Sequence, residues 1–148
     1  MNLSDVRELL WVASFLYGAS FLVGVLKTRY SLPVIAKESS FLLITAGFFI
    51  QTRALYLRGI EVHGCPLGNG LERTQFILWS LIIAYLLLRL LWHLNLLGTF
   101  CAGVSFAFGI LSLSLQDFDH AYWTASGYER LFKDPWIELH ASIAIFSY

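Results

Sequence analysis

The chain holds six residues outside or at the edges of its apolar segments whose side chains could do chemistry: His63, Cys65, His93, His120, Glu138 and His140. Imidazole nitrogens and thiolates are ligands that iron and other borderline or soft metals prefer. His140 is the strongest candidate, because it lies near the start of an apolar segment, where an ionisable group is costly to keep. Its imidazole either ligates a haem iron or hydrogen-bonds to a neighbouring helix or to lipid headgroups.

A second candidate is the glycine-rich segment 58–73, which we predict to be a loop. It contains a Cys65-Pro66 pair preceded by His63, and these residues could ligate haem or another soft metal. Alternatively, the glycines and the proline only fix an irregular turn.

The other polar candidates have plainer roles. We expect His93 to cap the end of the apolar segment before it, where a helix dipole favours a cation, and His120 to be a solvated loop residue. Cys101 lies in an apolar run, and we expect it to be inert. With no C-x-x-C motif, neither a thioredoxin-like redox pair nor a structural zinc site is indicated.

The composition is that of a membrane protein. Of 148 residues, 57% are hydrophobic and only 14% are charged, and the mean hydropathy is +0.66, whereas soluble domains are about 45–50% apolar. The ten basic and ten acidic residues cancel, so nothing resembles the basic surface of a nucleic-acid-binding protein. Fingerprints of hydrolases, zincins, P-loop proteins and Rossmann domains do not occur in the sequence.

Five apolar segments must position the candidate residues: 9–26, 40–57, 74–92, 96–115 and 137–148. The first four approach the roughly 20 residues that a membrane-spanning helix needs, and the last is long enough only for the start of a span. We therefore predict an all-α polytopic transmembrane bundle, a single membrane domain over 1–148, with about four full spanning helices and the beginning of a fifth.

Two features indicate how the segments are arranged. The third and fourth are separated by a very short connection, which predicts antiparallel neighbours. In the fourth, the pairs Gly98 and Ala102, and Gly103 and Ala107, each place two small residues on one helical face, as in closely packed membrane helices. Basic residues after the first segment and in short loops favour an N-terminus outside the membrane, with the long loops on the same side.

The last segment also resembles a known family. PWIELHASIAIFSY, residues 135–148, is similar to the W-x-x-x-H-x-x-x-x-x-x-x-Y stretch of CcsA-type cytochrome c assembly proteins and their HemX relatives, with Trp136, His140 and Tyr148 in the corresponding places. The G-C-P-L of residues 64–67, followed by Glu72 and Trp79, resembles a second pattern of that family. Together with the order of the apolar segments, the resemblance covers nearly the whole chain.

The resemblance implies a protein of the bacterial inner membrane, or of the thylakoid membrane, that carries haem b to the outer face and holds it for attachment to apocytochrome c. It implies that His140 is the first of two external axial ligands and that a second assembly membrane protein is a partner. It also implies that the chain matches the N-terminal part of the family fold, because the tryptophan-rich segment and the second histidine lie downstream in the family. Any enzymatic role would be as a component of a haem-attachment complex.

Two other functions stay open at this stage. One is a HemX-like regulatory protein of tetrapyrrole synthesis that acts through a partner. The other is a structural or transport subunit in which His140 only satisfies helix packing.

Overall fold

The computed structural model describes residues 3–29, 34–62, 67, 69–92, 95–115 and 135–147. Four long helices make up most of this part: α1 (Leu3–Arg29), α2 (Val34–Val62), α3 (Gly70–Trp92) and α4 (Asn95–Ser114). A shorter helix, α6 (Pro135–Ser147), follows. The described residues contain no strand, which confirms the prediction of an all-α fold.

Each of the four long helices is long and apolar enough to cross a membrane. The candidate spans are Asp5–Arg29, Glu38–Glu61, Gly70–Trp92 and Leu97–Ser114, with 25, 24, 23 and 18 residues. These lengths fit the roughly 17–25 residues of a transmembrane helix. The chain is therefore an integral membrane protein in contact with the lipid bilayer.

The predicted loop 58–73 is wrong at both of its ends. Helix α2 continues to Val62 and α3 already begins at Gly70. Charged residues do not end a helix at the membrane surface when they find partners, and Arg58 pairs with both Glu61 and Glu72. The start of α3 is fixed by Asn69, whose Oδ1 accepts a hydrogen bond from the backbone N–H of Glu72 at 2.7 Å, a typical N-cap.

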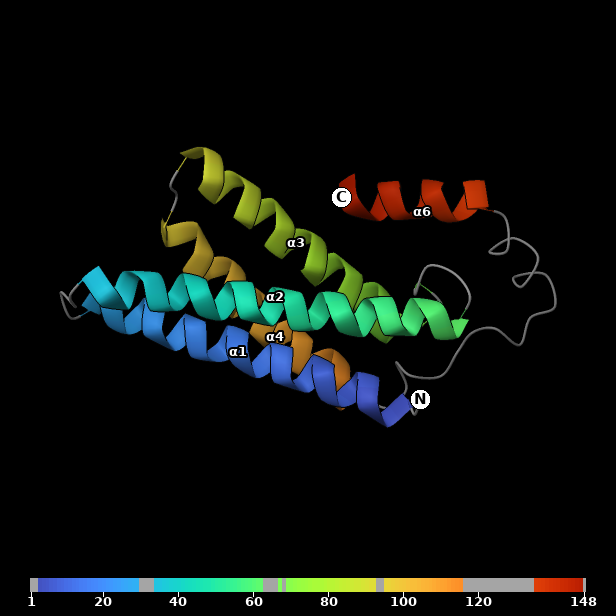
Figure 1. Cartoon of the computed structure of the whole chain (residues 1–148), viewed down its shortest axis with the longest axis horizontal. Coiled ribbons are helices and arrows are strands. Elements are labelled where there is room, and N and C mark those ends of the chain that lie inside the picture. The colour runs from blue at the N-terminus through green and yellow to red at the C-terminus, as the bar shows by residue number, and fades with distance from the viewer. Residues whose placement is uncertain are drawn as a thin grey trace.

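The four long helices pack as a bundle in which sequence neighbours lie side by side (Figure 1). Helix α1 packs most extensively against α2 and also against α4, and α3 packs mainly against α4. The antiparallel pairing predicted for α3 and α4 is confirmed. The start of α1, the end of α2, the start of α3 and the end of α4 meet at one end of the bundle, and α6 lies outside it next to α3.

Small residues allow the helices to approach closely. A Cβ at Gly18 of α1 would lie 2.6 Å from the Phe106 ring of α4, and one at Gly103 of α4 would lie 2.8 Å from the Phe21 ring of α1. A Cβ at Gly98 would clash with the hydroxyl of Tyr85 on α3. The small-residue packing predicted for α4 is thus confirmed at Gly98 and Gly103, whereas Ala107 is exposed.

The outer surface of the bundle is apolar, and its interior combines an apolar core with a set of buried polar side chains. Large apolar side chains such as Phe15, Leu42 and Phe49 are exposed and face the lipid region. Inside, a chain of hydrogen bonds links all four helices. The Tyr17 hydroxyl donates to Gln51 Oε1 at 2.8 Å, Gln51 Nε2 donates to Gln75 Oε1 at 2.9 Å, and Gln75 Nε2 contacts Ser112 Oγ at 3.1 Å.

This polar chain satisfies groups that have no other source of partners in a bilayer. Tyr17, Gln51 and Gln75 are each at most 2% exposed. Because no water reaches hydrocarbon, an unpaired amide or hydroxyl would be costly there. The hydrogen bonds therefore fix which faces of the four helices point inward.

Replacement of Gln51 by leucine tests this chain. The variant leaves the Tyr17 hydroxyl and the Gln75 amide oxygen without their partner, so we expect the free energy of unfolding in detergent to fall by about 1–2 kcal/mol. The matched control is Thr45→Val on the same helix, because Thr45 bonds only to the carbonyl of Phe41 in its own helix. Equal losses in the two variants would show that the interhelical chain adds no stability.

Candidate functional site

The exposed face of α6 carries His140. The helix begins at Pro135, a residue favoured in the first turn because its missing N–H needs no partner there. Trp136, His140 and Ile143 are spaced four and three residues apart, so they share one side of the helix, and all three are exposed. Trp136 is 77% exposed and Ile143 59%. The face thus presents one imidazole between an aromatic and an aliphatic side chain.

Within the described part of the chain, the His140 imidazole forms no hydrogen bond or ion pair. Hydrogen bonding of this ring to a neighbouring helix or to headgroups stays an alternative to iron ligation. Of the predicted candidates, His140 is the one whose side chain the structure describes.

The remaining predicted candidates lie outside the described residues. They are His63, Cys65, His93 and His120, together with the side chain of Glu138 on α6. The only described cysteine, Cys101, is buried in the bundle, as expected of an inert thiol. The described residues contain no cluster of three or more metal-binding side chains. A site built on His140 thus has one described protein ligand.

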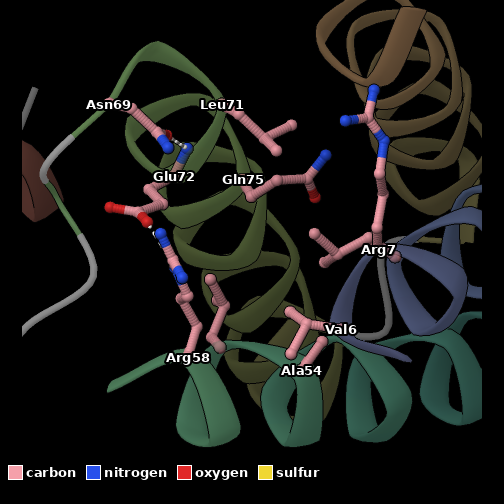
Figure 2. Close-up of a pocket in the computed structure, with 10 residues that line it drawn as sticks. Val6, Arg7, Ala54, Arg58, Asn69, Leu71, Glu72 and Gln75 are labelled. Atoms are coloured by element: carbon pink, nitrogen blue, oxygen red, sulfur yellow. Dashed lines mark hydrogen bonds and ion pairs between the residues drawn. The ribbon is translucent and has the colours of Figure 1, made fainter. Parts of the chain in front are cut away.

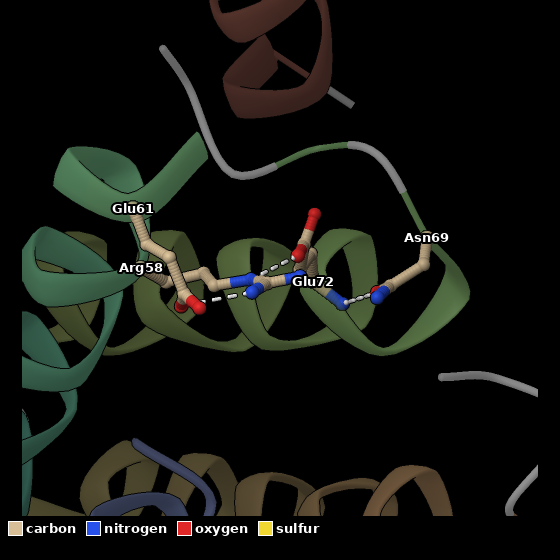
Figure 3. Close-up of polar contacts among 4 residues, drawn as sticks. All are labelled: Arg58, Glu61, Asn69 and Glu72. Atoms are coloured by element: carbon tan, nitrogen blue, oxygen red, sulfur yellow. Dashed lines mark hydrogen bonds and ion pairs between the residues drawn. The ribbon is translucent and has the colours of Figure 1, made fainter. Parts of the chain in front are cut away.

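A second polar site was not recognised in the sequence. Arg58 of α2 donates from Nε to Glu72 Oε1 of α3 at 2.6 Å and from Nη1 to Glu61 Oε2 at 2.9 Å (Figure 3). Glu72 is only 5% exposed, and its backbone N–H is capped by Asn69. The pair closes the end of the bundle by tying α2 to α3.

Beside this pair lies a small cavity between α1, α2 and α3 (Figure 2). Its walls include apolar Val6, Leu10 and Ala54 and the polar side chains of Glu72 and Gln75. The volume is about 30 Å³, which is room for one or two water molecules. The cavity lies between the ion pair and the inner chain of hydrogen bonds, because it is lined both by Glu72 of the pair and by Gln75 of the chain.

Arg7 secures the opposite side of the same end. Its side chain extends toward α4, where Nη2 donates to the carbonyl oxygen of Leu113 at 2.6 Å. That carbonyl belongs to the last turn of a helix, where such groups lack intrahelical partners and basic side chains often bond them. Arginines from α1 and α2 thus close two seams of the bundle.

Sequence reasoning missed these contacts for a definite reason. The segment 58–73 was interpreted as a loop, so Arg58 and Glu72 were not placed on facing helices. The available signal was the pairing of Asn69 with an acidic residue three positions later, which is typical of a helix start. With α3 begun at Gly70, the glutamate falls at the level of the end of α2.

No family model, curated protein or solved structure matches the chain.

The chemical capacities of the two sites differ. At the Arg58 and Glu72 site the charged groups bond to one another and Asn69 caps the helix start, which suits a structural junction. The α6 face offers a nitrogen ligand flanked by apolar surface, which suits a flat, largely apolar group that brings its own metal.

Loss of the buried carboxylate should destabilise the bundle. In Glu72→Gln the ion pair with Arg58 is lost, although the amide oxygen can still accept a hydrogen bond, and Glu61 stays as the charged partner of Arg58. We expect the free energy of unfolding to fall by about 2–3 kcal/mol, less than for a fully broken buried pair, because Arg58 is partly exposed and keeps an acceptor. The matched control is Glu61→Gln, for which a change below about 1 kcal/mol is expected. Comparable losses in both variants would contradict the structural role of Glu72.

Proposed function

We propose that this chain takes part in cytochrome c assembly by holding haem b at the membrane surface, with His140 as an axial ligand of the iron. The proposal starts from the sequence resemblance to CcsA-type proteins around Trp136 and His140. The observation that carries it is the exposed His140 imidazole, which has no bonding partner among the described residues and shares a face with Trp136 and Ile143.

The donor chemistry fits haem better than a bare metal ion. A bare ion needs several protein ligands, and the described residues hold no such cluster. Haem iron already has four ring nitrogens and needs only one or two axial ligands from protein, of which histidine is common. Haem itself would supply the group that is attached to the thiols of apocytochrome c.

The residues of α6 would then divide the work. The imidazole of His140 binds the iron, while Trp136 and Ile143 cover apolar parts of the macrocycle on either side. Helix α6 lies against α3, and the four-helix bundle anchors it in the bilayer. In this proposal apocytochrome c and a second assembly membrane protein approach the exposed face of α6, on the outer side of the bacterial inner membrane, where the N-terminus also lies.

A structural or transport subunit is the second candidate, and the hydrogen-bonded interior favours it. The chain from Tyr17 to Ser112 crosses all four helices and would stabilise such a bundle without any cofactor. A HemX-like regulatory role likewise needs no haem ligand. Both alternatives assign no iron-binding role to His140, so one measurement separates them from the first proposal.

That measurement is the visible absorption spectrum of the detergent-purified chain after addition of haem, beside that of His140→Ala. We expect a Soret band in the parent protein that weakens or shifts in the variant, because an axial ligand has been removed. Free imidazole should restore the band of His140→Ala toward that of the parent.

Leu139→Ala is the matched control, because Leu139 is an exposed apolar residue on the same helix. Its spectrum should remain that of the parent. A protein that takes up no haem in any form, or identical spectra for the parent and His140→Ala, would eliminate the proposed ligation and favour the structural or regulatory alternatives.

A further inference from the structure

A groove of mixed character runs between α1 and α2 near the end of the bundle where the former begins and the latter ends. It is lined by acidic, basic and apolar side chains: Asp5, Glu8, Leu9, Val12, Arg53 and Leu57. Its volume is about 380 Å³, within the roughly 300–1,000 Å³ typical of sites for small organic molecules. It lies on the outer surface of the bundle and is separate from both α6 and the Arg58 site.

Arg53 is the unusual residue of this groove. It lies inside the candidate span Glu38–Glu61, nine residues before α2 ends at Val62, which is roughly 14 Å along the helix axis. Its side chain is exposed and, in the part of the chain that the structure describes, forms no hydrogen bond or ion pair.

Other arginines of the bundle bond within the protein. Arg7 donates to the Leu113 carbonyl, Arg58 pairs with Glu72, and Arg89 contacts the Tyr85 hydroxyl. A guanidinium within a span normally pairs with protein groups or extends to the headgroup region. Arg53 is exposed and forms no ion pair with the carboxylates that line the same groove, which leaves its guanidinium able to bind the phosphate of a phospholipid.

The carboxylates of the groove restrict which lipid headgroups can bind there. Glu8 is exposed and, like Arg53, has no ion-pair or hydrogen-bond partner among described residues, and Asp5 lies one turn earlier on the same side of α1. Two carboxylates repel a purely anionic headgroup. They attract a headgroup that carries a cation beside its phosphate.

Hydrogen bonding distinguishes between the headgroups that carry a cation. A primary ammonium has three donors and can bond to carboxylate oxygens, whereas a quaternary ammonium has none. The apolar residues Leu9, Val12 and Leu57 give the groove a surface for the start of an acyl chain. Acidic, basic and apolar parts therefore match the three parts of an aminophospholipid.

We infer that the groove between α1 and α2 binds phosphatidylethanolamine, with the lipid phosphate on Arg53, the ammonium on Glu8, and an acyl chain along Leu9, Val12 and Leu57. The occupant is a lipid of the surrounding bilayer. This site does not depend on the function proposed for His140.

Native mass spectrometry of the detergent-purified chain tests the inference. The protein is incubated separately with phosphatidylethanolamine, phosphatidylcholine and phosphatidylglycerol of identical acyl chains, and the retained lipid is quantified. We expect phosphatidylethanolamine to be retained at least tenfold more tightly than either of the others, since only it satisfies both charges with hydrogen bonds.

Two variants assign the contacts. Arg53→Gln should lower retention of phosphatidylethanolamine about tenfold or more, and Glu8→Gln should remove most of the preference over phosphatidylcholine. Arg29→Gln is the matched control, because Arg29 is an exposed arginine at the other end of α1. Val12→Trp fills the groove without changing charge and should also displace the lipid, and thermal unfolding checks that each variant is folded.

Equal retention of the three lipids by the parent protein would overturn the inference. So would retention by Arg53→Gln and Glu8→Gln equal to that of the parent, which would mean that these two side chains only neutralise each other.

Discussion

The structure depends on one constraint: within a bilayer, buried amide and hydroxyl groups find hydrogen-bond partners inside the protein, because no water reaches them there. The chain from Tyr17 through Gln51 and Gln75 to Ser112 meets that constraint with one or more side chains from each of the four long helices. Rotation of any helix about its axis would break a link of the chain. The hydrogen bonds therefore specify the orientation of the helices, together with the close contacts at Gly18, Gly98 and Gly103.

The same constraint explains which parts of the fold could be predicted. The long apolar runs predicted four spanning helices, because length and hydrophobicity alone decide whether a segment crosses the bilayer. Helix ends were harder, since residues such as Arg58 and Glu61 are polar but helical when they are paired. The contact between Gln51 and Gln75 was not predicted from the sequence, although a glutamine inside a span indicates an interhelical contact.

The sequence indicated individual residues of the candidate site, above all His140, but not what surrounds them in the fold. His140 stood out because an ionisable ring near an apolar segment is costly, and the structure puts it on an exposed face of α6 with Trp136. The spacing of those two residues was visible in the sequence, but the absence of a described partner for the imidazole was not. Sequence spacing also cannot reveal the junction of Arg58 with Glu72, because that contact depends on how two helices meet.

The central position of α1 has a consequence for biosynthesis. This helix packs against both α2 and α4 and precedes them in chain order. During insertion, α2 thus enters a membrane in which its main packing surface, α1, is already present. The contact of Gly18 on α1 with Phe106 can form only after α4 has entered the bilayer. Helix α3 differs, because Gln75 reaches toward Ser112 of α4. Its final orientation is therefore set only after the helix that follows it has entered the bilayer.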